Sequence, residues 1–181
     1  MKVVLLREEF EIERTLHWMG SVNHDSYMRI TGAIKDLLVE DRDKQINLLV
    51  TSPGGPTGVA MSFFDLMRNI YRPNLQTVGS GDVDSAGVIL FLAGERRLIT
   101  SNTTMLLHLA GRTFDGGRRF STADMESMLK EDSLKDWQYA SVVATVSGKL
   151  SVEEVLDLMR KNTVLTATEA VELGIAHQVL Q

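Results

Sequence analysis

Ser85 is the residue of this sequence whose surroundings best suit a nucleophile. It follows a short apolar strand, predicted over residues 75–78, and two glycines at positions 79 and 81, and it precedes an apolar run at residues 88–93. This order of strand, glycine-rich turn and buried helix places Ser85 at a helix N-terminus, where backbone N–H groups are free and the helix dipole favours negative charge. The hydroxyl could then attack a carbonyl beside its own oxyanion donors. An isolated serine at a helix start is more often only an N-cap, so both interpretations stay open.

His108 ends a strand predicted over residues 104–108 that is otherwise mostly apolar. Open α/β sheets bind their ligands at the carboxyl ends of the strands. A histidine there can serve as a general base if it approaches a nucleophile. Taken alone, a histidine in this place is more often structural.

A Pro- and Gly-rich turn at residues 51–58 joins a predicted strand, 46–50, to a predicted helix. Gly54 and Gly55 allow a ligand to approach the backbone closely. The turn lacks the Gly-Lys-Ser/Thr ending of a phosphate-binding loop. An ordinary strand-to-helix turn remains the simpler interpretation of these residues alone.

Composition narrows the class of protein. The chain has 181 residues, a net charge of −5 and no cysteine, so it lacks the basic surplus of a nucleic-acid-binding protein and cannot form disulfides or thiolate sites. Its four histidines, at positions 17, 24, 108 and 177, show no metal-binding spacing. We therefore expect no metal, no cofactor, no nucleic acid and no membrane partner. The apolar runs are far too short to cross a bilayer, and a cytoplasmic protein is the default expectation.

Strand and helix patterns alternate along the chain, which predicts one α/β domain over residues 1–181 with helices covering a largely parallel sheet. The predicted order is an arm at 1–14, a strand at 16–19, a helix capped by Asn23 or Asp25, a strand at 46–50, a helix with Val59, Phe63, Leu66, Met67 and Ile70 on its inner face, strands at 75–78, 97–100 and 104–108, a long helix from about 121 to 147, two short helices, and a strand at 175–180. The two short helices begin with capping boxes, Ser151–Glu154 and Thr166–Glu169.

Over about residues 15–181 the chain resembles the proteolytic subunit of the Clp protease family. The segment 46–55 is close to that family's strand and Ser-Pro-Gly-Gly loop, and 81–87 stands where the family carries Gly-x-x-x-Ser-Met-Gly. Residues 102–108 are similar to its Pro-Asn-Ser-x-x-Met-Ile-His segment, and 165–174 to its closing Leu-Ser-Ala-x-Glu-Ala-x-x-x-Gly. Several motifs that follow one another in the family's order indicate the family far more specifically than any single motif does. The resemblance implies the ClpP/crotonase-like ββα spiral with a protruding handle helix at about 121–147.

The resemblance also implies roles for individual residues. Ser85 is the implied nucleophile, His108 the general base, and Asn162 occupies the place of the family's acid. The implied oxyanion donors are the backbone N–H groups of Gly55 and Ala86. The implied substrate-binding residues are Gly54, Gly116 and Gly117, the last two in a loop that pairs with an extended peptide.

Several positions depart from the family's pattern. Asn162 replaces an aspartate, so it can orient an imidazole but supplies no charge. Asp84 adds a negative charge beside the implied nucleophile, and Ala86 stands where the family has methionine. Leu109-Ala110 follows His108 in place of Gln-Pro, and the N-terminal arm is short.

The implied function is a serine endopeptidase subunit that cleaves unfolded polypeptides inside a homo-oligomer. The implied assembly is a tetradecamer of two stacked heptameric rings, served by a Clp-type ATP-dependent unfoldase. The Asn162 and Asp84 departures motivate an alternative, a weak or inactive subunit of a mixed ring. A second alternative is a crotonase-like acyl-CoA enzyme, because paired backbone oxyanion donors are common to both families. If the geometry is otherwise intact, Asn162→Asp is expected to raise turnover.

Overall fold

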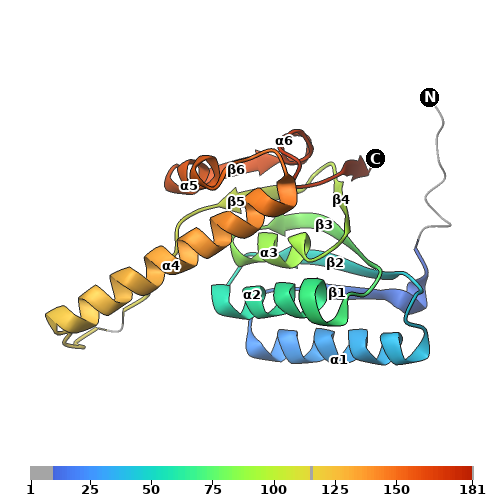
Figure 1. Cartoon of the computed structure of the whole chain (residues 1–181), viewed down its shortest axis with the longest axis horizontal. Coiled ribbons are helices and arrows are strands. Elements are labelled where there is room, and N and C mark those ends of the chain that lie inside the picture. Colours follow the sequence, from blue (N-terminus) through green and yellow to red (C-terminus); the bar gives the residue numbers. More distant parts are fainter. Residues whose placement is uncertain (1–9, 115, 181) are drawn as a thin grey trace.

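The structure, a computed structural model, describes residues 10–114 and 116–180. Its main sheet is parallel and has the strand order β1-β2-β3-β4-β7 (Figure 1). These strands are β1 (Thr15–Met19), β2 (Ile46–Ser52), β3 (Leu75–Val83), β4 (Arg96–Thr100) and β7 (Gln178–Leu180). Leu48, in the middle of β2, is fully buried and pairs with Leu16 on one side and Thr77 on the other. Parallel strands buried in this way place their carboxyl ends at one edge of the sheet.

Two further strands form a layer beside the main sheet. β5 (Thr104–Leu107) joins β3 through the pair Asp82–Thr104 and runs antiparallel to β6 (Thr163–Thr166). β6 had no counterpart among the predicted strands. It brings the C-terminal part of the chain against β5, the strand that directly precedes His108.

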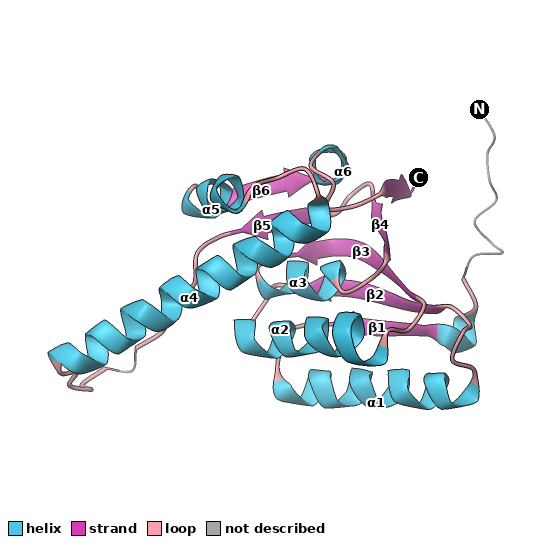
Figure 2. Cartoon of the chain, in the orientation of Figure 1, coloured by secondary structure: helices cyan, strands magenta, loops and turns pink. Residues whose placement is uncertain are grey.

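The helices lie mainly on one side of the sheet, and one of them extends well beyond it (Figure 2). They are η2 (Ile12–Arg14), α1 (His24–Glu40), α2 (Thr57–Asp65), η3 (Leu66–Tyr71), α3 (Ala86–Leu92), α4 (Thr122–Ser147), α5 (Val152–Arg160) and α6 (Ala167–Glu172). Every residue of α3 is buried. α4 projects from the body like a handle, with only its C-terminal part packed on the core.

Local sequence signals explain most helix ends. The Asn23 side chain accepts a hydrogen bond from the Ser26 N–H, so Asn23 rather than Asp25 caps α1. Capping boxes are present at the starts of α4, α5 and α6. Gly148, in the left-handed conformation, ends α4.

The strand predicted over residues 75–78 is longer than expected. β3 continues through Gly79 and Gly81 to Val83, so these two glycines lie in a strand and not in a turn.

Two further expectations need correction. Ile70 was predicted on the inner face of its helix, but it is 65% exposed. The helix widens into the π-helical segment η3 after Asp65, and this change of period moves Ile70 out of line with Phe63 and Met67. Of the arm predicted at 1–14, residues 1–9 lie outside the described part, and the end of that range is not an arm: Arg14 is buried and donates hydrogen bonds to carbonyl groups around the end of α1.

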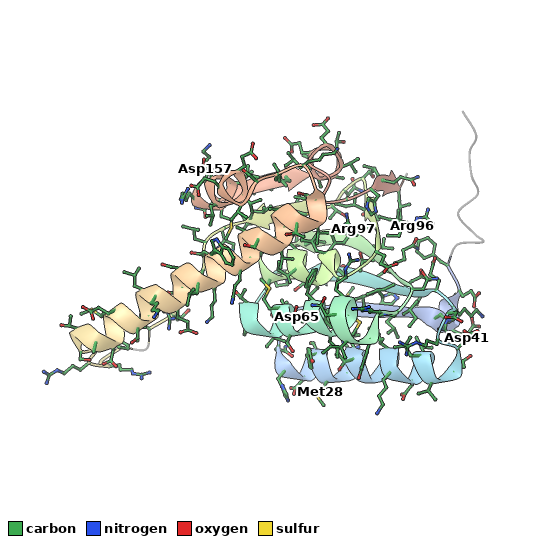
Figure 3. The ribbon with its side chains drawn as sticks, in the orientation of Figure 1. Met28, Asp41, Asp65, Arg96, Arg97 and Asp157 are labelled. Atoms are coloured by element: carbon green, nitrogen blue, oxygen red, sulfur yellow. The ribbon has the colours of Figure 1, made fainter. Side chains whose placement is uncertain are left out.

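Arg97, in β4, binds the C-terminal part of the chain by hydrogen bonds and is labelled in Figure 3. Its guanidinium is almost fully buried and donates to backbone carbonyls of Ile175, Gly174, Val146 and Gly94, the shortest bond being 2.7 Å to Ile175. Burial lowers the pKa of Arg97 to about 10, which still leaves it charged at neutral pH.

Candidate active site

Ser85 occupies a sharp turn between β3 and α3. Its φ of 53° and ψ of −123° lie in a region that residues with a side chain rarely adopt. The Ser85 side chain makes no capping hydrogen bond to the helix that follows it. The N-cap interpretation therefore does not explain this serine, and its hydroxyl is left available for another role.

Ser85 and His108 line the same cleft, which has a volume of about 470 Å³. Both side chains are half-buried. His108 follows directly after β5, and the Ser85 N–H donates to the carbonyl of Leu106 at 2.8 Å, so the two segments are held side by side. Within the described residues, no hydrogen bond joins the Ser85 hydroxyl to the His108 ring. Catalytic hydrogen bonds are often long without substrate and tighten when it binds.

The Gly54–Gly55 loop closes one side of the cleft. A Cβ on Gly54 would lie 2.7 Å from the Ser85 Cβ, and a Cβ on Gly55 would collide with the Val22 carbonyl. Both glycines also have positive φ, 97° and 150°. The sequence pattern Gly-Gly is therefore required, because the loop packs closely against the turn that carries Ser85 and against the backbone of Val22.

Two backbone donors lie at this loop and this turn. In residues 10–114 and 116–180, neither the Gly55 N–H nor the Ala86 N–H donates a hydrogen bond to a protein acceptor. Gly55 lines the cleft, and Ala86 is the first residue of α3. The N-terminus of α2 also reaches the cleft through Thr57. Free N–H groups at helix starts favour an anion here.

Asp84 does not direct its carboxylate at these donors. Its Oδ1 accepts a hydrogen bond from the Leu106 N–H at 2.8 Å, so the side chain extends the contact between β3 and β5. Burial raises the pKa of Asp84, while the Leu106 bond lowers it and the charge of Asp82 raises it. This carboxylate therefore has a structural partner that the sequence did not reveal.

Asn162 lies close to His108 through the pairing of β5 with β6. The antiparallel register pairs Leu107 with Thr163, so His108 and Asn162 each stand one residue beyond that pair. Asn162 is exposed, has a φ of 50°, and donates its backbone N–H to the carbonyl of Met159. Among the described residues, no hydrogen bond links its amide to the His108 ring. The role of Asn162 stays a prediction.

Charged side chains from α4 form the outer wall of the cleft. Arg112 makes a two-point contact with Asp132, at 3.0 and 2.7 Å, and a contact of 2.6 Å with Glu131. Lys135 pairs with Glu131. Hydrogen bonds from Lys135 and Arg112 lower the pKa of Glu131 to about 2. Both cations at this wall are thus paired with carboxylates.

The substrate-binding role of Gly54, Gly116 and Gly117 stays a prediction. Gly54 adjoins the Ser85 turn, but the residues that line the cleft after His108 are Ala110, Gly111 and Arg112, and Gly116 and Gly117 are not among them. The part of the chain that the structure describes also contains no group of three His, Asp or Glu residues that could hold a metal ion. No helix in that part is long and apolar enough to cross a membrane.

Comparisons with known proteins identify the family of the chain. Residues 2–181 match the family described as Clp protease. The chain belongs to the Clp protease family. It is 33% identical over 142 residues to "ATP-dependent Clp protease proteolytic subunit 1" of Thermobifida fusca, covering 77% of this chain and 62% of the relative. It is 33% identical over 141 residues to "ATP-dependent Clp protease proteolytic subunit 2" of Corynebacterium jeikeium, covering 77% and 65%.

The fold is that of the Clp protease family. The structure of a ClpP1 mutant from Listeria monocytogenes, in which an asparagine is replaced by aspartate, matches with a TM-score of 0.82 and 22% identity, over 98% of this chain and 96% of that one. This confirms the expected α/β fold with a largely parallel sheet and a protruding handle helix. The matches to the curated relatives span less than two thirds of their length.

Proposed function

We propose that this member of the Clp protease family is a serine endopeptidase subunit that acts on unfolded polypeptides. One observation carries the proposal: the strained, uncapped Ser85 shares a cleft with His108 and Gly55. The N–H groups of Gly55 and of Ala86, the residue after Ser85, are both free. A nucleophile, a base and two oxyanion donors are the parts that acyl transfer needs.

The proposed reaction follows from these positions. As the Ser85 Oγ bonds to the peptide carbonyl carbon, its proton passes to His108. The Gly55 and Ala86 N–H groups donate hydrogen bonds to the carbonyl oxygen and stabilise the negative charge that develops on it. His108 then gives the proton to the leaving nitrogen as the C–N bond breaks. A water molecule, deprotonated by His108, releases the acyl group from Ser85 in the same way.

Asn162 takes the third place in this proposal. Its amide oxygen can orient the His108 ring, but it provides no charge for the imidazolium that forms. The Listeria protein described above is itself an asparagine-to-aspartate mutant. An exchange of the same type at Asn162 tests whether this chain is limited by the missing charge.

Assembly is part of the same proposal. The exposed part of α4 carries Met125, Leu129, Leu134 and Trp137, each more than half exposed. A group of exposed apolar side chains on a projecting helix suits contact with other subunits. We propose a homo-oligomer of two stacked heptameric rings, and a Clp-type ATP-dependent unfoldase as the partner that supplies chains to be cleaved.

A fluorophosphonate probe tests the chemistry. The wild-type assembly should be labelled at Ser85, and Ser85→Ala should lose both labelling and peptide cleavage. Ser101→Ala, which changes an exposed serine in the turn between β4 and β5, is the matched control and should keep both. An assembled wild-type protein that neither reacts with the probe nor cleaves peptides would refute the peptidase. Binding of an acyl-CoA thioester would instead support the crotonase-like alternative.

A further inference from the structure

One stripe of the handle helix contacts both segments of the proposed active site. Asp132, Asp136 and Tyr139 are spaced four and three residues apart on α4, so they lie on one face of the helix. The Tyr139 hydroxyl donates to the Ser85 carbonyl at 3.1 Å, and Tyr139 is buried. The other two residues contact the chain that follows His108.

Asp136 makes the contact nearest to His108. Its Oδ1 accepts a hydrogen bond of 2.7 Å from the N–H of Ala110, two residues beyond the histidine. Ala110 lines the cleft together with Ser85 and His108, and both Asp136 and Ala110 are half-buried. A charge-assisted bond in a partly buried site is stronger than one between neutral groups.

The sequence makes this bond possible at a place where the family pattern has proline. Proline has no N–H, whereas Ala110 donates one to Asp136. Two residues further on, Arg112 binds Asp132 and Glu131 of the same helix. The segment 108–112, which has no regular secondary structure, is therefore held by side chains of α4 rather than by a sheet partner.

From these contacts we infer that Asp136 is a positioning residue: through the Ala110 N–H it holds the segment that carries His108 in reach of Ser85. This inference rests on the proposed function, since His108 is the base only if the protein is a serine peptidase. Asp136 itself does not touch the reacting atoms. It acts by fixing the backbone that presents the imidazole.

Variants of both partners test the bond. Asp136→Ala removes the acceptor and should lower kcat, and the rate of fluorophosphonate labelling, by about 10- to 100-fold with KM nearly unchanged, because small misplacements of a catalytic group cost this much. Asp136→Asn keeps an oxygen acceptor and should restore most of the rate. Glu126→Ala, which changes an exposed carboxylate on the same helix, is the matched control and should behave as wild type.

A double-variant comparison separates this bond from general damage to the helix. Ala110→Pro removes the donor, and adding Asp136→Ala to it should cause little further loss if the two groups act through one hydrogen bond. Gel filtration and thermal unfolding show whether each variant assembles and folds. Equal kcat for wild type and Asp136→Ala, or full additivity with Ala110→Pro, would overturn the inference.

Hydrogen exchange gives a readout that does not need activity. The Ala110 amide should exchange at least about tenfold faster in Asp136→Ala than in wild type, because exchange requires the bond to open. If wild type fails to react with the probe while this amide is protected by Asp136, the proposed function fails and the structural contact stands. If the probe reacts but the amide exchanges equally in both proteins, the peptidase stands and the positioning role is refuted.

Discussion

Restoring a carboxylate at position 162 is the most direct test of the proposed chemistry. In Asn162→Asp we expect the new charge to lie near His108, because each of these residues stands one place beyond the Leu107–Thr163 pair. Opposed residues of antiparallel strands have Cβ atoms about 5 Å apart. The left-handed conformation of Asn162 is one that aspartate also tolerates, so the exchange adds little backbone strain.

The gain follows from the charge interaction in the transition state. At a separation of about 5 Å, a carboxylate and an imidazolium attract by roughly 3 kcal/mol with an effective dielectric constant of about 20, and by about 0.8 kcal/mol in bulk water. Asn162 is exposed, so about 1–2 kcal/mol is the appropriate range. That energy corresponds to a rise in turnover of about 5- to 30-fold.

Peptide cleavage by the assembled protein measures this effect. We expect kcat to rise in Asn162→Asp and the acid limb of the kcat/KM profile to move to higher pH, because the new carboxylate stabilises the protonated ring. Asn102→Asp, which changes an exposed asparagine in the turn between β4 and β5, is the matched control for a general change of charge. Turnover that is equal to or below wild type, in a variant that still folds and assembles, would refute the reasoning about the third residue.

Three other predictions concern the surroundings of the site and the packing of the chain. Gly54→Ala should abolish probe labelling and lower the melting temperature, since its Cβ would lie 2.7 Å from the Cβ of Ser85 and its φ is 97°. Asp84→Asn should unfold at a higher urea concentration than wild type at pH 7. Burial raises the pKa of Asp84 above its ordinary value of 3.8, so the folded state binds more protons than the unfolded state. The wild type therefore loses stability as the pH rises through the pKa of the folded state, whereas the asparagine variant does not. His177→Gln should lose less stability than wild type when urea unfolding is repeated below pH 6.5. Burial and the charge of Arg97 lower the pKa of His177, so the folded state binds fewer protons than the unfolded state. The wild type is therefore destabilised as the pH falls below 6.5. Parallel urea curves for His177→Gln and wild type across that range, a lower urea midpoint for Asp84→Asn, or unchanged labelling of Gly54→Ala, would contradict these expectations.

Short-range sequence signals predicted a large part of the fold. The strand at 46–50 is confirmed within β2, and the helix from about 121 to 147 is confirmed as α4. The two predicted capping boxes are confirmed because each is set by residues only three positions apart. Signals of this kind depend on local geometry and not on contacts with distant parts of the chain.

The features that the sequence did not reveal depend on pairing between distant segments. β6 is only four residues long, and its partner β5 lies about sixty residues earlier in the chain. The hydrogen bonds of Asp84 to Leu106 and of Asp136 to Ala110 likewise join separate elements. No periodicity or cap marks such contacts, because a carboxylate on a helix or in a turn resembles an ordinary exposed charge until its partner is placed.

Backbone conformation separates the candidate site from the rest of the chain. In the described residues, only Arg72, Ser85 and Asn162 adopt positive φ without being glycine. Arg72 ends a helical segment, where a left-handed residue is common, whereas the strain at Ser85 serves no cap. Such conformations cost about 1–3 kcal/mol and persist where surrounding contacts hold them. At Ser85 those contacts are the Leu106 carbonyl and the Tyr139 hydroxyl, so the same bonds that maintain the strained turn also keep the serine beside the strand that precedes His108.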